Sequence, residues 1–392
     1  MAAFLGEWLN LLLRWAHLVV GIGWIGTSFY FIALDYSLRA RERMNQGVRG
    51  TAWQVHGGGF YHVEKYMVAP AHLPHDLHWF KYEAYLTWAT GFALLVVQYY
   101  WNADRYLIDA TVMPLSQWQA IGLSALSFVI GWLIYDGLSR WLAQDHPVLL
   151  ALAVFALVVM SAELYAQVFS ARGAFLHVGA LVGTIMAVNV FAIIIPNQKK
   201  LIAQMMRGET PDARFGIVGK QRSLHNNYLT LPVLLMMVSP HYPFLSAHPH
   251  TWLVVALIFL TGGVVRHFFN RIDAGDGYEG YGWTLPVAAF GLICAIYATA
   301  PRAVGGGAAV SEGQVVAIAQ KHCVACHGKT PTAPGLTEAP NGVVLESAAD
   351  VRRFAQPILQ QAVQSTAMPL GNVTGMTIAE RDALGRWIAA LK

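Results

Sequence analysis

Residues 148–167 read VLLALAVFALVVMSAELYAQ, a run of 20 residues in which Glu163 carries the one charge. A helix of this length rises about 30 Å, the thickness of the hydrocarbon core of a bilayer. Seven further apolar runs of spanning character lie between the N-terminus and about residue 299: roughly 10–34, 82–100, 118–142, 174–195, 224–239, 251–271 and 283–299. The sequence therefore predicts an all-α fold, a polytopic bundle of eight transmembrane helices.

The composition of the whole chain agrees with a membrane protein. Of its 392 residues, 56% are hydrophobic and 12% are charged, whereas soluble domains contain about 25% charged residues. The net charge of +4 gives no sign of a nucleic-acid-binding protein, and three cysteines are too few for a disulfide scaffold. Beyond Thr299 the sequence becomes that of an ordinary soluble domain. We expect a membrane domain over 1–300, a glycine-rich linker over 301–311 and a soluble domain over 312–392.

Basic residues are distributed unevenly among the predicted loops. One side of the bundle has fourteen: Arg39, Arg41, Arg43, Arg49, Lys65, Lys81, Arg140, Lys199, Lys200, Arg207, Arg214, Lys220, Arg222 and Arg271. The other side has three: Arg105, Arg172 and Arg302. Because positively charged loops stay in the cytoplasm, we expect both termini on the opposite side, as an even number of crossings requires.

The soluble domain contains Cys323-Val324-Ala325-Cys326-His327, a CxxCH motif. Two thiols at this spacing can form thioethers to the vinyl groups of a haem, and the adjacent histidine then reaches the iron. Met368, 41 residues after His327 and followed by Pro369, is the expected second axial ligand. With helices expected at 312–322 and 377–391, the domain resembles a class I cytochrome c. Such haems are attached outside the cytoplasmic membrane, which predicts periplasmic termini and a bacterial inner-membrane location.

Two histidines lie within predicted spans at similar depth. His17 shares a helix face with Arg14, Gly21 and Trp24, and His177 lies near the start of the fifth span. Ionisable groups inside a membrane are costly and commonly functional. We expect His17 and His177 to ligate the iron of a haem b; the alternative for each is a buried histidine that hydrogen-bonds to a neighbouring helix.

Other histidines lie toward the basic side. His225 and His267 fit either hydrogen-bonding roles or a second haem b. His72, His75 and His78 have a spacing of three residues that suits a metal, although Pro74 interrupts the run. His62 lies in the same loop.

Several longer motifs resemble one family. They are WAHLVVGIGWIGTSFYF at 15–31, VHGGGFY at 55–61, LHWFKYEAY at 77–85 and SLHNNY at 223–228. Together with the cytochrome-like domain, they are similar to the membrane-bound, cytochrome c-linked urate oxidases of bacteria. The resemblance implies oxidation of urate to 5-hydroxyisourate without hydrogen peroxide, with electrons passing through haem to the respiratory chain. It carries over no catalytic residue.

Urate is an anion, so we expect its pocket at the basic face. Candidates for its oxygens and ring nitrogens are Arg266, Lys220, Asn226 and Asn227. Glu64, or a histidine such as His225 or His267, is a candidate proton acceptor. Water would supply the hydroxyl group, and two one-electron transfers are needed for each turnover. The expected partners are urate and either cytochrome c oxidase or a soluble cytochrome c.

Two alternatives stay open at this point. One is a non-enzymatic membrane protein, either a haem- or copper-handling protein or a permease, fused to a redox-sensing cytochrome c. The other is a cytochrome-linked dehydrogenase of another small substrate.

Overall fold

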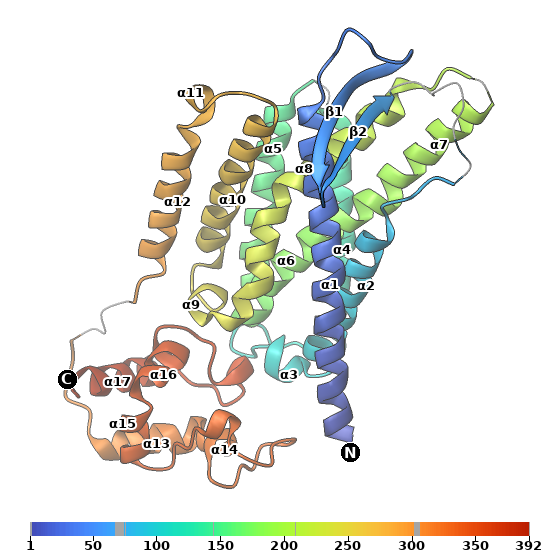
Figure 1. The fold of residues 1–392 in the computed structure, drawn as a ribbon. Helices are drawn as coiled ribbons and strands as arrows, with labels where there is room; N and C mark the ends of the chain where they lie inside the picture. Colours follow the sequence, from blue (N-terminus) through green and yellow to red (C-terminus); the bar gives the residue numbers. More distant parts are fainter. Residues whose placement is uncertain are drawn as a thin grey trace.

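Long helices arranged side by side make up most of the structure (Figure 1). The computed structural model describes residues 2–66, 74, 76–143, 145–207, 209–301 and 306–391. The bundle consists of α1 (Ala2–Ser37), α2 (Tyr82–Leu95), α4 (Gln117–Leu142), α5 (Pro147–Ala166), α6 (Ala171–Val188), α8 (Ala213–Val238), α10 (Thr251–Asp273) and α12 (Thr284–Ala298). Single π-helical turns extend α2 as η1 (Val96–Tyr100) and join α6 through η2 (Asn189–Ile194) to α7 (Ile195–Met206).

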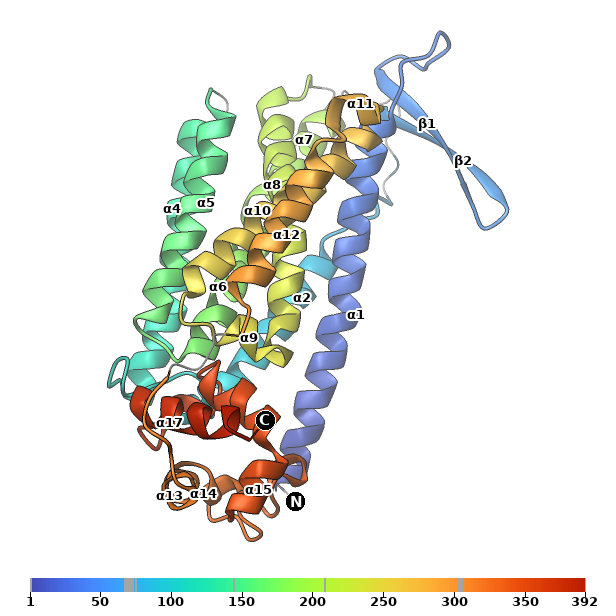
Figure 2. The same ribbon diagram turned by 90° about the vertical axis from the view of Figure 1, so that its left-hand side faces the viewer.

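Six helical segments among the described residues are long and apolar enough to cross a membrane: Phe4–Ser37, Gln117–Leu142, Pro147–Ala166, Ala171–Met206, Thr251–Asp273 and Tyr278–Ala298. The other two predicted spans correspond to α2 with η1 and to α8. Both lie within the bundle (Figure 2), but α8 begins with a charged half that includes Lys220 and Arg222. The predicted helical membrane bundle is confirmed in this coarser form, and eight crossings stay a prediction.

The two ends of the bundle differ. The N-terminus and the C-terminal domain lie at one end, while the α4–α5, α7–α8 and α10–α12 connections lie at the other (Figure 1). The latter end also carries a β-hairpin, β1 (Val48–His56) paired antiparallel with β2 (Gly59–Tyr66). Gly57 and Gly58 form its turn with φ of 58° and 80°, the left-handed pair that a two-residue hairpin turn favours. The all-α prediction missed this hairpin, which the run His56-Gly57-Gly58-Gly59 could have signalled.

Helix α6 lies at the centre of the bundle and is its most enclosed element. Half of an apolar 18-residue stretch in Ala171–Met206, the segment that begins with α6, is buried, compared with 11% in Tyr278–Ala298, the outer segment that ends in α12. Gly131 of α4 shows how closely its neighbours approach: a Cβ atom there would come within 2.5 Å of Leu181. Small residues at such contacts let membrane helices pack closely.

The C-terminal domain has a hydrophobic core of its own. It contains α13 (Glu312–His322), α14 (Val324–His327), α15 (Ala348–Arg353), α16 (Ala355–Ile358) with the π-helical turn η5 (Leu359–Val363), and α17 (Ile378–Ala389). The first and last of these helices pack together through Val315, Leu384 and Ile388. Capping boxes at Ser311 and Thr377 fix where the two helices begin.

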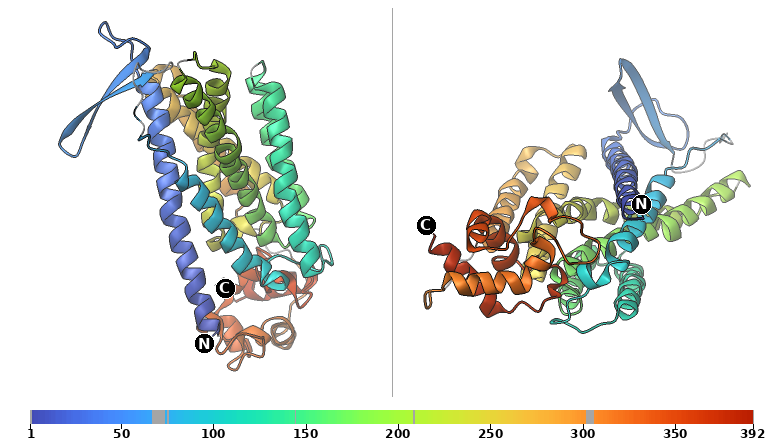
Figure 3. Two further views of the ribbon diagram at one scale, coloured as in Figure 1. Left: turned by 90° about the vertical axis from the view of Figure 1, so that its right-hand side faces the viewer. Right: turned by 90° about the horizontal axis from the view of Figure 1, so that it is seen from below.

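The domain lies at one end of the bundle (Figure 3, left). It contacts the bundle near the short helices α3 (Ala103–Tyr106) and α9 (Pro243–Ser246). Arg105 Nη2 donates to the carbonyl oxygen of Pro334 at 2.7 Å. The backbone N–H of Thr366 donates to the carbonyl oxygen of Ala247 at 3.4 Å. The segment that carries Met368 therefore faces the membrane domain.

Candidate functional site

The CxxCH motif forms the short helix α14 directly after α13. Cys323 and Cys326 are both free thiols, and burial raises the pKa of Cys323 to about 11. His327 Nδ1 lies 2.9 Å from the carbonyl oxygen of Val343. Because a carbonyl only accepts, Nδ1 carries the proton and Nε2 keeps its lone pair. Metal-ligating histidines commonly have this arrangement.

Met368 is half-buried and packs against the core of the C-terminal domain. The buried Arg381 of α17 donates to the carbonyl oxygens of Ala362 at 2.6 Å and Met368 at 2.7 Å. It thus ties the methionine segment to the terminal helix. Arg381 is not among the residues expected from the sequence, although a cation three residues before Leu384 on an apolar helix face was a usable signal. Two thiols, one imidazole with a free Nε2 and one thioether are a donor set that fits a covalently attached haem.

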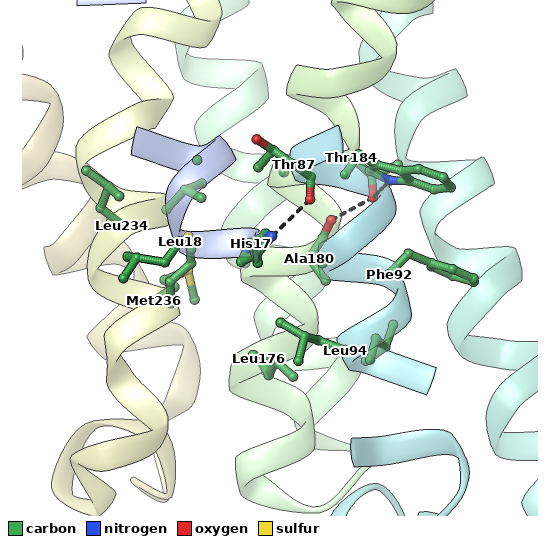
Figure 4. Close-up of a pocket in the computed structure, with 18 of the residues that line it drawn as sticks. His17, Leu18, Thr87, Phe92, Leu94, Leu176, Ala180, Thr184, Leu234 and Met236 are labelled. Atoms are coloured by element: carbon green, nitrogen blue, oxygen red, sulfur yellow. Dashed lines mark hydrogen bonds between the residues drawn. The ribbon is translucent and has the colours of Figure 1, made fainter. Parts of the chain in front are cut away.

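A cavity of about 440 Å³ lies among α1, α2, α6 and α8 (Figure 4). Its wall is mostly apolar, and the predicted face of α1, with Arg14, His17, Gly21 and Trp24, lines it. A volume of this size is in the range of sites for small molecules and cofactors. Residues that share a face of α1 in the sequence therefore also share one cavity.

His17 has the same hydrogen-bond arrangement as His327. Its Nδ1 lies 3.0 Å from the carbonyl oxygen of Thr87 (Figure 4). The same nitrogen lies 3.0 Å from the hydroxyl of Thr90. The carbonyl places the proton on Nδ1, which leaves the Nε2 lone pair for another partner. Gly91 lies directly beside this ring, because a Cβ atom at that position would come within 2.9 Å of His17 Cε1.

His177 differs from His17 in its position relative to the cavity and in the hydrogen bonds of its ring. It is fully buried and does not line the cavity. Its Nδ1 pairs with the carbonyl oxygen of Gly173 and its Nε2 with the hydroxyl of Ser124, each at 2.7 Å. Both ring nitrogens are therefore in use, and the structure does not bring His177 to one site with His17. His241, which the sequence analysis did not consider, lines the cavity instead.

The candidates at the basic end divide between two sides of α8. Asn226 faces α6: it donates to the carbonyl oxygen of Met186 at 2.9 Å and accepts from Asn189 at 3.1 Å. His225 Nδ1 pairs with the hydroxyl of Tyr135 at 2.8 Å. These side chains adjoin a buried ion pair in which Arg222 Nη2 lies 2.6 Å from Asp136 Oδ1.

Asn227 faces α10, where it forms a second group that we call the Arg266 cluster: Arg266, Asn227 and Asn270. Arg266 Nε donates to Asn227 Oδ1 at 3.0 Å, and Asn270 Nδ2 donates to the same oxygen at 2.9 Å. The ring of Phe29 from α1 covers the guanidinium at 4.0 Å. Asn270, which lies one helical turn beyond Arg266, is not among the residues expected from the sequence.

The remaining candidates lie elsewhere. Nδ1 of His267 pairs with the hydroxyl of Tyr228 at 2.7 Å. Lys220 lies 3.7 Å from Asp35.

Glu64 is on the hairpin, which projects away from the bundle (Figure 2). Hydrogen bonds from Asn45 and Tyr66 hold the pKa of its carboxyl below the usual range. The structure does not bring Glu64 to the Arg266 cluster.

The run His72, His75 and His78, which has a spacing that suits a metal, lies only partly within the described residues. His72 and His75 lie outside the described residues, His78 packs against Phe80 at 4.6 Å between ring centroids, and His62 packs on Trp53 at 4.5 Å. Within the part of the chain that the structure describes, no group of three or more His, Cys, Asp or Glu side chains could hold a metal ion.

Comparison with known proteins identifies one family. A family model described as "Urate oxidase N-terminal" matches residues 3–300, the whole of the helical bundle. No curated protein and no solved structure matches the chain.

Proposed function

We propose that this chain, which belongs to the urate oxidase N-terminal family, is a membrane-bound enzyme that oxidises urate to 5-hydroxyisourate. The family match over the complete bundle carries the proposal. In the balanced reaction, the urate anion and water give neutral 5-hydroxyisourate, one proton and two electrons. The oxygen atom thus comes from water, and no hydrogen peroxide is formed.

The C-terminal domain is the proposed electron acceptor. Cys323 and Cys326 would hold a haem c by thioethers, and His327 Nε2 and the Met368 thioether would be ligands of its iron. A haem held in this way supplies the capacity to take up one electron at a time. The hydrogen bond from His327 to Val343 and the two from Arg381 orient its protein ligands. From this domain, electrons would pass to cytochrome c oxidase or to a soluble cytochrome c.

The cavity beside His17 is the proposed site of a haem b between the two faces of the membrane. A bilayer core of about 30 Å is too wide for one efficient transfer, so an intermediate carrier is needed. The free Nε2 of His17 and the mostly apolar wall support this role. The hydrogen bonds of His177 favour a structural role for that residue. Both ring nitrogens of His225 have hydrogen-bond partners, Tyr135 at Nδ1 and Gln221 at Nε2, and we propose no second haem b.

The basic end would face the cytoplasm of a bacterium and the termini the periplasm. The uneven distribution of basic residues supports this orientation. The C-terminal domain lies at the opposite end from the basic loops (Figure 1), which agrees with attachment of haem c outside the inner membrane.

Isolated membranes provide the test. Urate should reduce the covalently bound haem, and oxygen uptake with urate should stop when cyanide blocks the terminal oxidase. Hydrogen peroxide produced in step with urate loss would instead indicate direct reaction with dioxygen and contradict the proposal. Reduction by another small substrate, but not by urate, would favour a different cytochrome-linked dehydrogenase.

A further inference from the structure

We infer that the Arg266 cluster is the urate-binding site and that Asn270 is its hydrogen-bond acceptor, an inference that rests on the proposed function for the identity of the ligand. The cluster lies where α8 and α10 pack together and where α1 covers them. It is at the same end of the bundle as the basic loops.

The three side chains of the cluster carry polar atoms without partners. Arg266, Asn227 and Asn270 are 6%, 0% and 0% exposed. Among the described residues, Arg266 Nη2, Asn227 Nδ2 and Asn270 Oδ1 have no hydrogen-bond partner. Burial of such atoms without partners costs free energy, and native structures rarely tolerate it. Three of them in one connected group indicate a ligand that supplies the missing partners.

The internal hydrogen bonds of the cluster decide which atoms stay free. Asn227 Oδ1 accepts from both Arg266 Nε and Asn270 Nδ2. This fixes the orientation of both amides, because the oxygen of Asn227 and the nitrogen of Asn270 are already used. Two donors, Arg266 Nη2 and Asn227 Nδ2, and one acceptor, Asn270 Oδ1, are therefore held ready for a ligand.

Urate has the complementary groups along each edge of its flat rings. Its carbonyl oxygens accept hydrogen bonds and the adjacent ring N–H groups donate. A guanidinium also compensates the negative charge of the urate anion. In this arrangement Arg266 and Asn227 donate to oxygens of urate, and Asn270 accepts from a ring N–H. The half-buried ring of Phe29, which lies on the guanidinium, closes the site and moves aside when urate enters.

Asn189, at the same end of the bundle, does not present such a set. Asn189 is also fully buried, but its Nδ2 donates to Tyr135 and Asn226 and its Oδ1 accepts from Arg222. Its hydrogen-bonding capacity is met by the protein. It therefore serves as a matched control for Asn270: the same residue type, the same burial, and no free atom.

The experiment measures urate binding and turnover in the purified full-length protein and in Asn270→Ala, Arg266→Gln and Asn189→Ala. Equilibrium dialysis with labelled urate gives Kd, and urate-dependent haem reduction gives KM and kcat. Loss of one buried hydrogen bond to an anionic ligand should raise Kd and KM on the order of tenfold or more. Asn189→Ala should leave Kd within about twofold of the wild type. Reduction by dithionite and total haem content report folding.

Methylated urates make the test independent of any folding defect. In one N-methyl isomer, the methyl group replaces the hydrogen atom that Asn270 would accept. This isomer should bind the wild type at least about tenfold more weakly than urate. Asn270→Ala should lose this discrimination. If all N-methyl isomers bind the wild type as urate does, Asn270 accepts no urate proton and the inference is wrong.

Different results would contradict the proposed function and the assignment of the urate-binding site. A wild-type protein that neither binds nor oxidises urate would refute the proposed function, and the inference with it. Normal urate turnover together with an unchanged Kd in Asn270→Ala and Arg266→Gln would overturn the inference alone. An equal loss in Asn189→Ala would assign the effect to packing and would overturn it as well.

Discussion

Replacing Gly91 with alanine tests whether the proposed haem b depends on the position of the His17 imidazole. A Cβ atom at Gly91 would lie 2.9 Å from Cε1 and 3.3 Å from Nδ1 of the His17 ring. Optimal contacts between carbon atoms are about 3.5–4.0 Å, so the ring has to move by at least about half an ångström. That movement weakens the 3.0 Å hydrogen bond from Nδ1 to the carbonyl oxygen of Thr87.

Three effects set the expected size of the destabilisation. Overpacking costs about 1–3 kcal/mol, and loss of the hydrogen bond costs about 1 kcal/mol. The better helix propensity of alanine over glycine offsets about 1 kcal/mol. The net loss is about 2 kcal/mol. Because the free Nε2 moves with the ring, the proposed haem b (protohaem) should also be lost, or its absorption spectrum should change.

The assay is the ratio of protohaem to covalent haem in the purified protein, measured by the pyridine haemochrome method. The covalent haem is an internal standard, since the CxxCH motif is untouched. Gly26→Ala in α1 is the control, because a Cβ atom there meets nothing within 4 Å. If Gly91→Ala keeps the wild-type ratio, spectrum and thermal stability, the imidazole of His17 is not a fixed ligand and the reasoning is refuted.

Three further outcomes are expected in the C-terminal domain. Cys323→Ala with Cys326→Ala should abolish haem staining after denaturing electrophoresis while the bundle stays folded by size-exclusion chromatography; stain retained by the double variant would show attachment elsewhere. Met368→Ala should keep the haem attached but remove the thioether-to-iron absorption band, and Arg381→Met should weaken that band; an unchanged spectrum in Met368→Ala would assign the ligand to another residue. Glu380 accepts from Lys321 Nζ at 2.8 Å, and chiefly this bond, with those from Thr377 and His322, holds the pKa of Glu380 far below the usual value of 4.5. Because the folded pKa is depressed, this stabilisation is present above about pH 4.5 and is lost as the pH falls; Glu380→Gln should flatten the acid side of the melting temperature plotted against pH, and curves that stay parallel would contradict it.

The apolar helices and the position of the basic loops at one end of the bundle could be predicted because each depends on local sequence. Hydropathy along a run of about 20 residues decides whether it can cross a bilayer. The spacing of Cys323, Cys326 and His327 is set by four consecutive peptide bonds. Periodicity also placed Arg14, Gly21 and Trp24 beside His17, since residues three or four apart share a helix face.

Which polar side chains remain free was decided by tertiary packing alone. The sequence gives the same prediction, haem ligation, for His17 and His177. In the structure, however, the hydroxyl of Ser124, 53 residues before His177, forms a hydrogen bond with Nε2 of His177. Asn226 and Asn227 are neighbours, but a step of one residue turns the side chain about 100° around a helix. One therefore contacts α6, where its hydrogen bonds are met, and the other contacts α10, where Asn270 completes a cluster with unused donors and an unused acceptor. Helix formation depends on near neighbours along the chain, whereas a free lone pair depends on whichever helix happens to pack opposite.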